Sequence, residues 1–74
     1  MSLSELPLKK RARIRRIRAK NEAIRSRLHA LGVVKGERVR LLNHTLANQT
    51  FEIEAGDTRL ALRKEEADSV EVEA

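Results

Sequence analysis

The chain has 74 residues, of which 41% are hydrophobic; Phe51 is the only aromatic residue, there is no cysteine, and the net charge is +5. At this length a domain buries only about 60% of its unfolded surface, so we expect one domain over residues 1–74 with a thin aliphatic core. Without cysteine or a long apolar run, we expect no disulfide, no thiolate metal site, no transmembrane span and no signal-peptide core, as in a cytoplasmic protein.

The charge is divided unevenly along the chain. Residues 1–40 carry 13 Lys and Arg against three Glu, a net of +10, whereas residues 41–74 carry three Lys and Arg against eight acids, a net of −5. Such polarity indicates either a nucleic-acid-binding arm or two halves of one fold that neutralise each other.

The segment from Ala12 to Leu31 allows two interpretations. Its apolar residues follow a 3-4 heptad spacing, which would suit one long basic helix, but they span fewer than the three or four heptads that make this pattern persuasive. Alternatively, a strand with a bulge at Arg15-Arg16 precedes a short helix that Asn21 caps and Gly32 closes. We favour the second interpretation and predict a break between Arg18 and Glu22.

The rest of the chain reads as strands. One is predicted from about Glu37 to Asn43, and the segment 51–55 then alternates apolar with acidic residues. Gly56-Asp57 is the predicted hairpin turn, because glycine tolerates the positive φ that such turns require. This register pairs Ile53 with Leu60, and it places Glu54 opposite Arg59 as an ion pair.

A helical turn over Lys64–Asp68 and a last strand around Val70 and Val72 complete the pattern. So few short strands cannot bury both of their faces alone, but a first strand and a covering helix would complete a small barrel. We therefore predict a mainly β fold: a barrel of about five strands, with one short α-helix between strands 1 and 2 and a short helical turn before the last strand.

This order of elements resembles the ferrous iron transport protein A (FeoA) family of small bacterial SH3-like domains. The resemblance is carried by Leu31-Gly32 followed by Lys35-Gly36, and by Leu60-Ala61-Leu62-Arg63 leading into the last strand. It implies a partner of the membrane iron transporter FeoB, which carries a GTP-binding domain. The chain departs from the family where a Pro usually stands at Lys35, and where a Gly often stands within Lys9–Arg11.

No catalytic constellation accompanies this pattern. No serine lies in a nucleophile motif, there is no phosphate-binding glycine loop, and we expect no enzyme activity and no cofactor. The resemblance implies that a divalent transition metal could bind, for which His29 and His44 are the candidate ligands. A ferrous site needs several convergent donors, so we predict no tight ferrous site in the isolated domain.

Two surfaces remain as candidates for binding. The basic stretch Lys9–Lys20 could bind nucleic acid, but the sequence has no aromatic stacking platform, and its arginines could instead pair with Glu71 and Glu73. Contact with FeoB is the preferred function, nucleic-acid binding is the rival, and we expect a monomer or a weak homo-oligomer. The predicted partner-binding residues are basic or apolar and lie on the helix and the neighbouring loops: Arg25, Arg27, Leu31, Val33, Val34 and Leu46.

Overall fold

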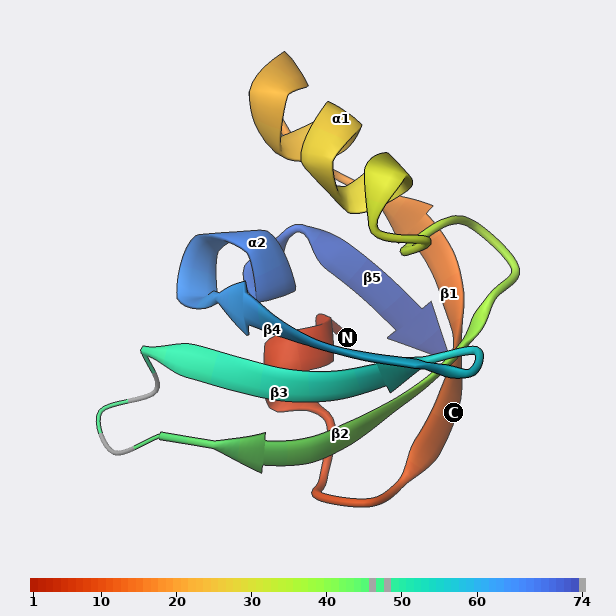
Figure 1. Ribbon diagram of the computed structural model, residues 1–74, viewed down its shortest axis with the longest axis vertical. Helices are drawn as coiled ribbons and strands as arrows, with labels where there is room; N and C mark the ends of the chain where they lie inside the picture. The colour runs from red at the N-terminus through yellow and green to blue at the C-terminus, as the bar shows by residue number, and fades with distance from the viewer. Residues whose placement is uncertain (46, 48, 74) are drawn as a thin grey trace.

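A five-stranded antiparallel sheet with strand order β4-β3-β2-β1-β5 curls around the core (Figure 1). The computed structural model describes residues 1–45, 47 and 49–73. The predicted helix lies between the first two strands and the predicted helical turn lies before the last strand. The elements are η1 Leu3–Glu5, β1 Arg11–Ile17, α1 Glu22–Ala30, β2 Arg38–His44, β3 Thr50–Ala55, β4 Thr58–Arg63, α2 Lys64–Asp68 and β5 Val70–Glu73.

The predicted break after the first strand is confirmed. β1 ends at Ile17, and α1 begins at Glu22. Against β5, Ile14 pairs with Val72 and Arg16 with Glu71, so Arg15 is the extra residue of a β-bulge. The bulge returns Ile17 toward the core, and the rival interpretation as one continuous helix is wrong.

Both ends of α1 have the predicted caps. At its start, the Asn21 side chain accepts a hydrogen bond from the Ala23 N–H at 2.8 Å. At its end, Gly32 has φ +85°, and the Val33 N–H donates to the Leu28 carbonyl at 2.9 Å. This is a Schellman motif, and its accompanying apolar contact joins two fully buried side chains, Leu28 and Val33.

The hairpin of β3 and β4 has the predicted register. Ile53 lies opposite Leu60, Phe51 lies opposite Leu62, and the chain turns at Gly56 with φ +60°. Phe51 is 2% exposed, which confirms it as the aromatic residue of the core.

The predicted Glu54–Arg59 ion pair is wrong. Glu54 and Arg59 lie opposite each other, but the Glu54 carboxylate binds Arg40 of β2, with 3.1 Å between Arg40 Nη2 and Glu54 Oε1. β3 is an inner strand with a neighbour on each side, and a hairpin pattern reveals only one of them. Arg40 also lies opposite Arg11, and a carboxylate beside it offsets the repulsion between these two like charges.

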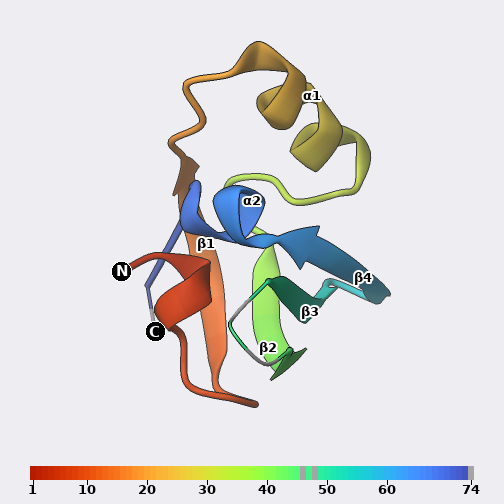
Figure 2. The ribbon, with the colours of Figure 1, turned by 90° about the vertical axis from the view of Figure 1, so that its left-hand side faces the viewer.

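Two leucines near the N-terminus join the core although the sequence patterns did not assign them there. Leu3 and Leu6 are 0% and 3% exposed, because η1 folds under the sheet beside α2 and β5 (Figure 2). The signal was present in Ser2-Leu3-Ser4-Glu5, a capping-box sequence in which the Ser2 N–H donates to the Glu5 carboxylate at 2.9 Å. In the described part of the chain, no helix is long and apolar enough to cross a membrane.

Candidate functional site

Helix α1 and the loop that follows it carry most of the predicted partner-binding residues. The helix lies at one end of the long axis of the molecule, and the turn between β3 and β4 lies away from it (Figure 1). Arg25 is exposed, and its Nη2 donates to the Ala19 carbonyl at 3.1 Å. Ile24 packs against the core but stays partly exposed beside it. The helix therefore presents a cation next to an apolar margin.

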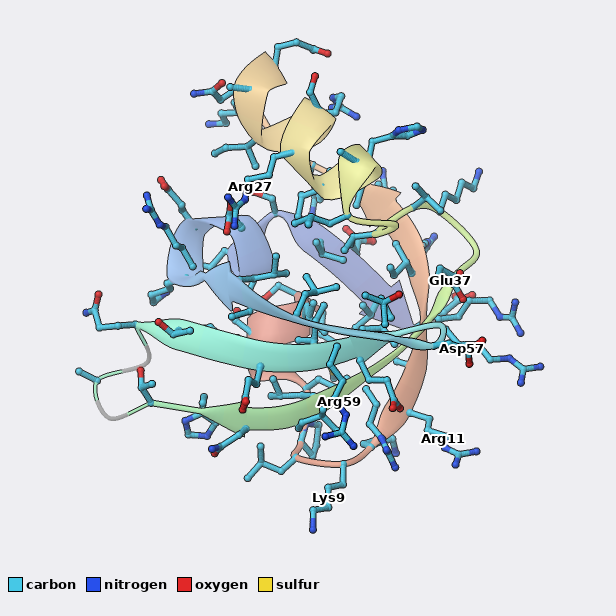
Figure 3. The ribbon with its side chains drawn as sticks, viewed as in Figure 1. Lys9, Arg11, Arg27, Glu37, Asp57 and Arg59 are labelled. Atoms are coloured by element: carbon cyan, nitrogen blue, oxygen red, sulfur yellow. The ribbon has the colours of Figure 1, made fainter. Side chains whose placement is uncertain are left out.

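Arg27 has a second role that the sequence did not reveal. Its Nε lies 2.6 Å from Oε2 of Glu66 on α2, and the Arg27 side chain is 52% exposed whereas that of Glu66 is 5% exposed. Figure 3 shows Arg27 between the two helices. The other Glu66 oxygen accepts the Arg63 backbone N–H at 2.8 Å. Glu66 is the only buried charged residue in the described part of the chain. Its ion pair with Arg27 joins α1 to the barrel.

The apolar partner-binding residues differ in their exposure. Val33 is fully buried in the core, whereas Leu31 and Val34 are half-buried. Of the two adjacent valines, Val34 is therefore the one whose side chain is accessible to a partner. Leu46 lies outside the described residues.

The two histidines, the candidate metal ligands, lie on different elements. His29 is exposed on α1 and lines a 270 Å³ surface depression with Glu22, Arg25 and Ser26. His44 ends β2, where its ring lies 6.1 Å from that of Phe51. Among the described residues, no group of three or more His, Cys, Asp or Glu side chains could hold a metal ion.

The basic first strand is partly neutralised by one acid. Glu71 on β5 lies within 4.0 Å of Arg15, Arg16 and Arg18, with a shortest distance of 2.9 Å between Arg18 Nη1 and Glu71 Oε2. The predicted pairing with Glu71 is thus confirmed, but Glu73 forms no ion pair with any other described residue. One carboxylate shared by three guanidinium groups leaves this edge of the sheet positively charged.

Comparison with known proteins places the chain in a family. The FeoA domain family matches the sequence over residues 1–74. The structure is similar to that of FeoA from Stenotrophomonas maltophilia complexed with zinc, an SH3 domain protein, with 41% identity, a TM-score of 0.85, and coverage of 99% of this chain and 89% of that one.

Two other bacterial proteins support this placement. The iron(II) transport protein A of Clostridium thermocellum is 33% identical with a TM-score of 0.89, over 99% of this chain and 44% of that one. FeoA from Chlorobium tepidum is 32% identical with a TM-score of 0.87, over 97% and 68%.

More distant similarities show the fold alone. A manganese-dependent transcriptional repressor has a TM-score of 0.87 at 13% identity, over 95% of this chain and 39% of that one. Among curated proteins, no sequence matches this chain. The arrangement of strands and helices agrees with the match over residues 1–74 and with the relatives above 30% identity. The chain therefore belongs to the FeoA family, which is associated with ferrous iron transport.

Proposed function

We propose that this FeoA domain is a non-enzymatic, cytoplasmic accessory module of ferrous iron uptake. It acts by contacting the GTP-binding domain of a FeoB-type membrane transporter. The Stenotrophomonas relative has been put forward as an activating factor of ferrous iron transport, and the proposal extends that kind of role to this chain. The contact surface is α1 with the loop after it.

One observation carries the proposal: an ion pair between Arg27 and Glu66 joins α1 to the barrel, while the outer side of the helix stays exposed. Its two caps stabilise the ends of the helix, and the Arg27–Glu66 ion pair joins it to α2. The exposed Arg25 and the half-buried Leu31 and Val34 then combine charge with apolar surface. In transient complexes charge sets the rate of encounter, and a few apolar anchors set the lifetime.

The test is a calorimetric titration with the transporter's GTP-binding domain. Arg25→Glu and Val34→Ser should each weaken binding at least about tenfold, or about 1.4 kcal/mol. Arg63→Glu, which reverses an exposed arginine on β4, is the matched control and should bind like the wild type. Arg27→Glu is not a clean probe, because it would place a second carboxylate against Glu66.

If both test variants bind like the wild type and stay folded, the contact surface lies elsewhere. Leu46, which rests on the sequence alone, would then be the next anchor to replace.

The rival proposal of nucleic-acid binding through Lys9–Lys20 has less support. It depended most on a continuous basic helix, whereas β1 ends at Ile17 and three arginines of this stretch gather around Glu71. Steep loss of duplex DNA binding with added salt would favour the rival, and weak binding throughout would remove it.

A further inference from the structure

The turn before β1 presents a leucine to solvent. The Lys10 N–H donates to the Pro7 carbonyl at 3.2 Å, and the Lys9 N–H donates to the Leu41 carbonyl at 2.6 Å, which ties the turn to β2. Leu8, at the tip, is 50% exposed, and Met1 is the only other exposed large apolar side chain in the described part of the chain. A fixed turn therefore holds an aliphatic side chain away from the core.

Lys9 takes up a backbone conformation that favours glycine. Its φ is +66°, at the third residue of a four-residue turn, where type II turns require a positive φ. A glycine would occupy this position without strain, so the lysine is present at some cost in stability. Such an outlier motivates a search for a function of the side chain.

The neighbouring face of the sheet is crowded with arginines. Across β1 and β2, Arg11 lies opposite Arg40 and Arg13 lies opposite Arg38, although like charges in directly opposed positions destabilise a sheet. Of these four, Arg40 alone forms an ion pair with a described residue. The surface between them is hollowed by adjoining depressions of 150 and 390 Å³, both lined by Arg11 and Arg38; Glu54 and Glu73 are the acids at their edges.

We define the basic turn surface as Leu8 together with the exposed cations of the turn and of the two strands that the turn adjoins. Figure 3 shows Lys9 and Arg11 at the same end of the molecule. The members are Leu8, Lys9, Lys10, Arg11, Arg13 and Arg38, all of them exposed.

We propose that the basic turn surface adsorbs the domain onto anionic lipid bilayers. A bilayer interface offers negative headgroups above an apolar layer, and each Lys or Arg near such a surface strengthens binding. The exposed Leu8, in the same turn as Lys9 and Lys10, fits that layering, with no helix inserted into the membrane. Nucleic acid fits less well, because Leu8 would face phosphates and Phe51, the only Phe, Tyr or Trp of the chain, is buried.

The position of this surface has a consequence for the transporter contact. Figures 1 and 2 place α1 at one end of the long axis and the turn before β1 at the other. A domain adsorbed through the turn would direct α1 away from the bilayer, toward a partner in the cytoplasm. This consequence rests on the proposed function, whereas adsorption itself does not.

The experiment measures co-sedimentation with vesicles of phosphatidylcholine mixed with phosphatidylglycerol, and with vesicles of phosphatidylcholine alone. The wild type should bind the anionic vesicles, more weakly as salt is added, and should not bind the neutral ones. The double variant Lys10→Glu/Arg11→Glu should bind the anionic vesicles at least about tenfold more weakly.

Arg25→Glu/Arg63→Glu is the matched control, because it changes the net charge equally at exposed positions outside the basic turn surface. It should retain most of the binding, and far-UV circular dichroism should show that both double variants are folded. The chain has no tryptophan, so Leu8→Trp supplies a single reporter whose emission should shift to the blue on anionic vesicles. Ala30→Trp, exposed on α1, should not shift.

Equal losses in the two double variants would overturn the proposal, because net charge alone would then explain binding. No vesicle binding, equal binding to neutral vesicles, or an unshifted emission from the Leu8→Trp variant would overturn it as well. Tighter binding to duplex DNA than to anionic vesicles, lost in the same double variant, would assign the surface to nucleic acid instead. Vesicle binding that persists when the transporter contact fails would leave this inference intact and refute the proposed function.

Discussion

Removing the Arg27 side chain should destabilise the fold, although half of that side chain is exposed. In Arg27→Ala, the Glu66 carboxylate, 5% exposed in the wild type, keeps the Arg63 N–H but loses its partner at 2.6 Å. A hydrogen bond to a charged group contributes about 1.5–3 kcal/mol. The larger values for fully buried pairs do not apply, because water can approach from the Arg27 side. We therefore expect a loss of about 1.5–3 kcal/mol, a substantial part of the roughly 4–11 kcal/mol typical of a domain this size.

A double-mutant cycle separates the pair from its surroundings. Glu66→Gln keeps an oxygen for the Arg63 N–H and removes the charge, so it should cost about 1–2 kcal/mol, and its coupling to Arg27→Ala should be about 1 kcal/mol or more. Stability is measured by urea denaturation, followed by far-UV circular dichroism. Arg25→Ala is the control on the same helix and should cost less than about 1 kcal/mol, since it loses only a bond to a carbonyl. Single losses below about 0.5 kcal/mol with no coupling would show that α1 is not held by this pair.

Three further predictions concern the core, the turn and the response to acid. Phe51→Ala should lower the free energy of unfolding by about 3–5 kcal/mol in urea denaturation, because Phe51 is 2% exposed; a change near zero would contradict its burial in solution. Lys9→Gly should leave that free energy unchanged or raise it by up to about 1 kcal/mol, whereas Lys9→Val should lower it by about 1–2 kcal/mol; the reverse order would refute the positive φ. Hydrogen bonds from Lys64 and then Ser4 lower the pKa of Asp68 from its ordinary value of 3.8. Its contribution to stability is therefore complete above that value and is lost as the pH falls below it, so Asp68→Asn should flatten the acid limb of a pH titration of stability; an unchanged limb would contradict the assignment.

Features set by neighbouring residues were predictable from the sequence. The β3–β4 register followed from Gly56 and the alternation around it, and the ends of α1 followed from Asn21 and Gly32. The bulge at Arg15 followed from the broken parity of the apolar residues in the first strand. Each of these signals is contained in a few consecutive residues, where propensity and pattern act directly.

Features that depend on distant segments were not predictable in the same way. A second bulge at Leu42 shifts the β2–β3 register between Leu41 and Asn43, and the alternation of residues 38–41, from which the strand was predicted, does not indicate it. The choice of Arg40 as the partner of Glu54 depends on strand order. The ion pair between Glu66 and Arg27 joins two helices that are far apart in the sequence, so the residue that anchors the candidate surface could not be found from local sequence.

The most direct test of the account is an isotope-edited NMR titration of the labelled domain with the transporter's GTP-binding domain. If α1 is the contact surface, amide shifts will concentrate on α1 and the loop after it, at Arg25, Arg27, Leu31 and Val34, while the strands β3 and β4 change little. Saturable shifts of this pattern would support α1 as the contact surface. An unchanged spectrum at high partner concentration, or shifts confined to β1 and β2, would contradict it.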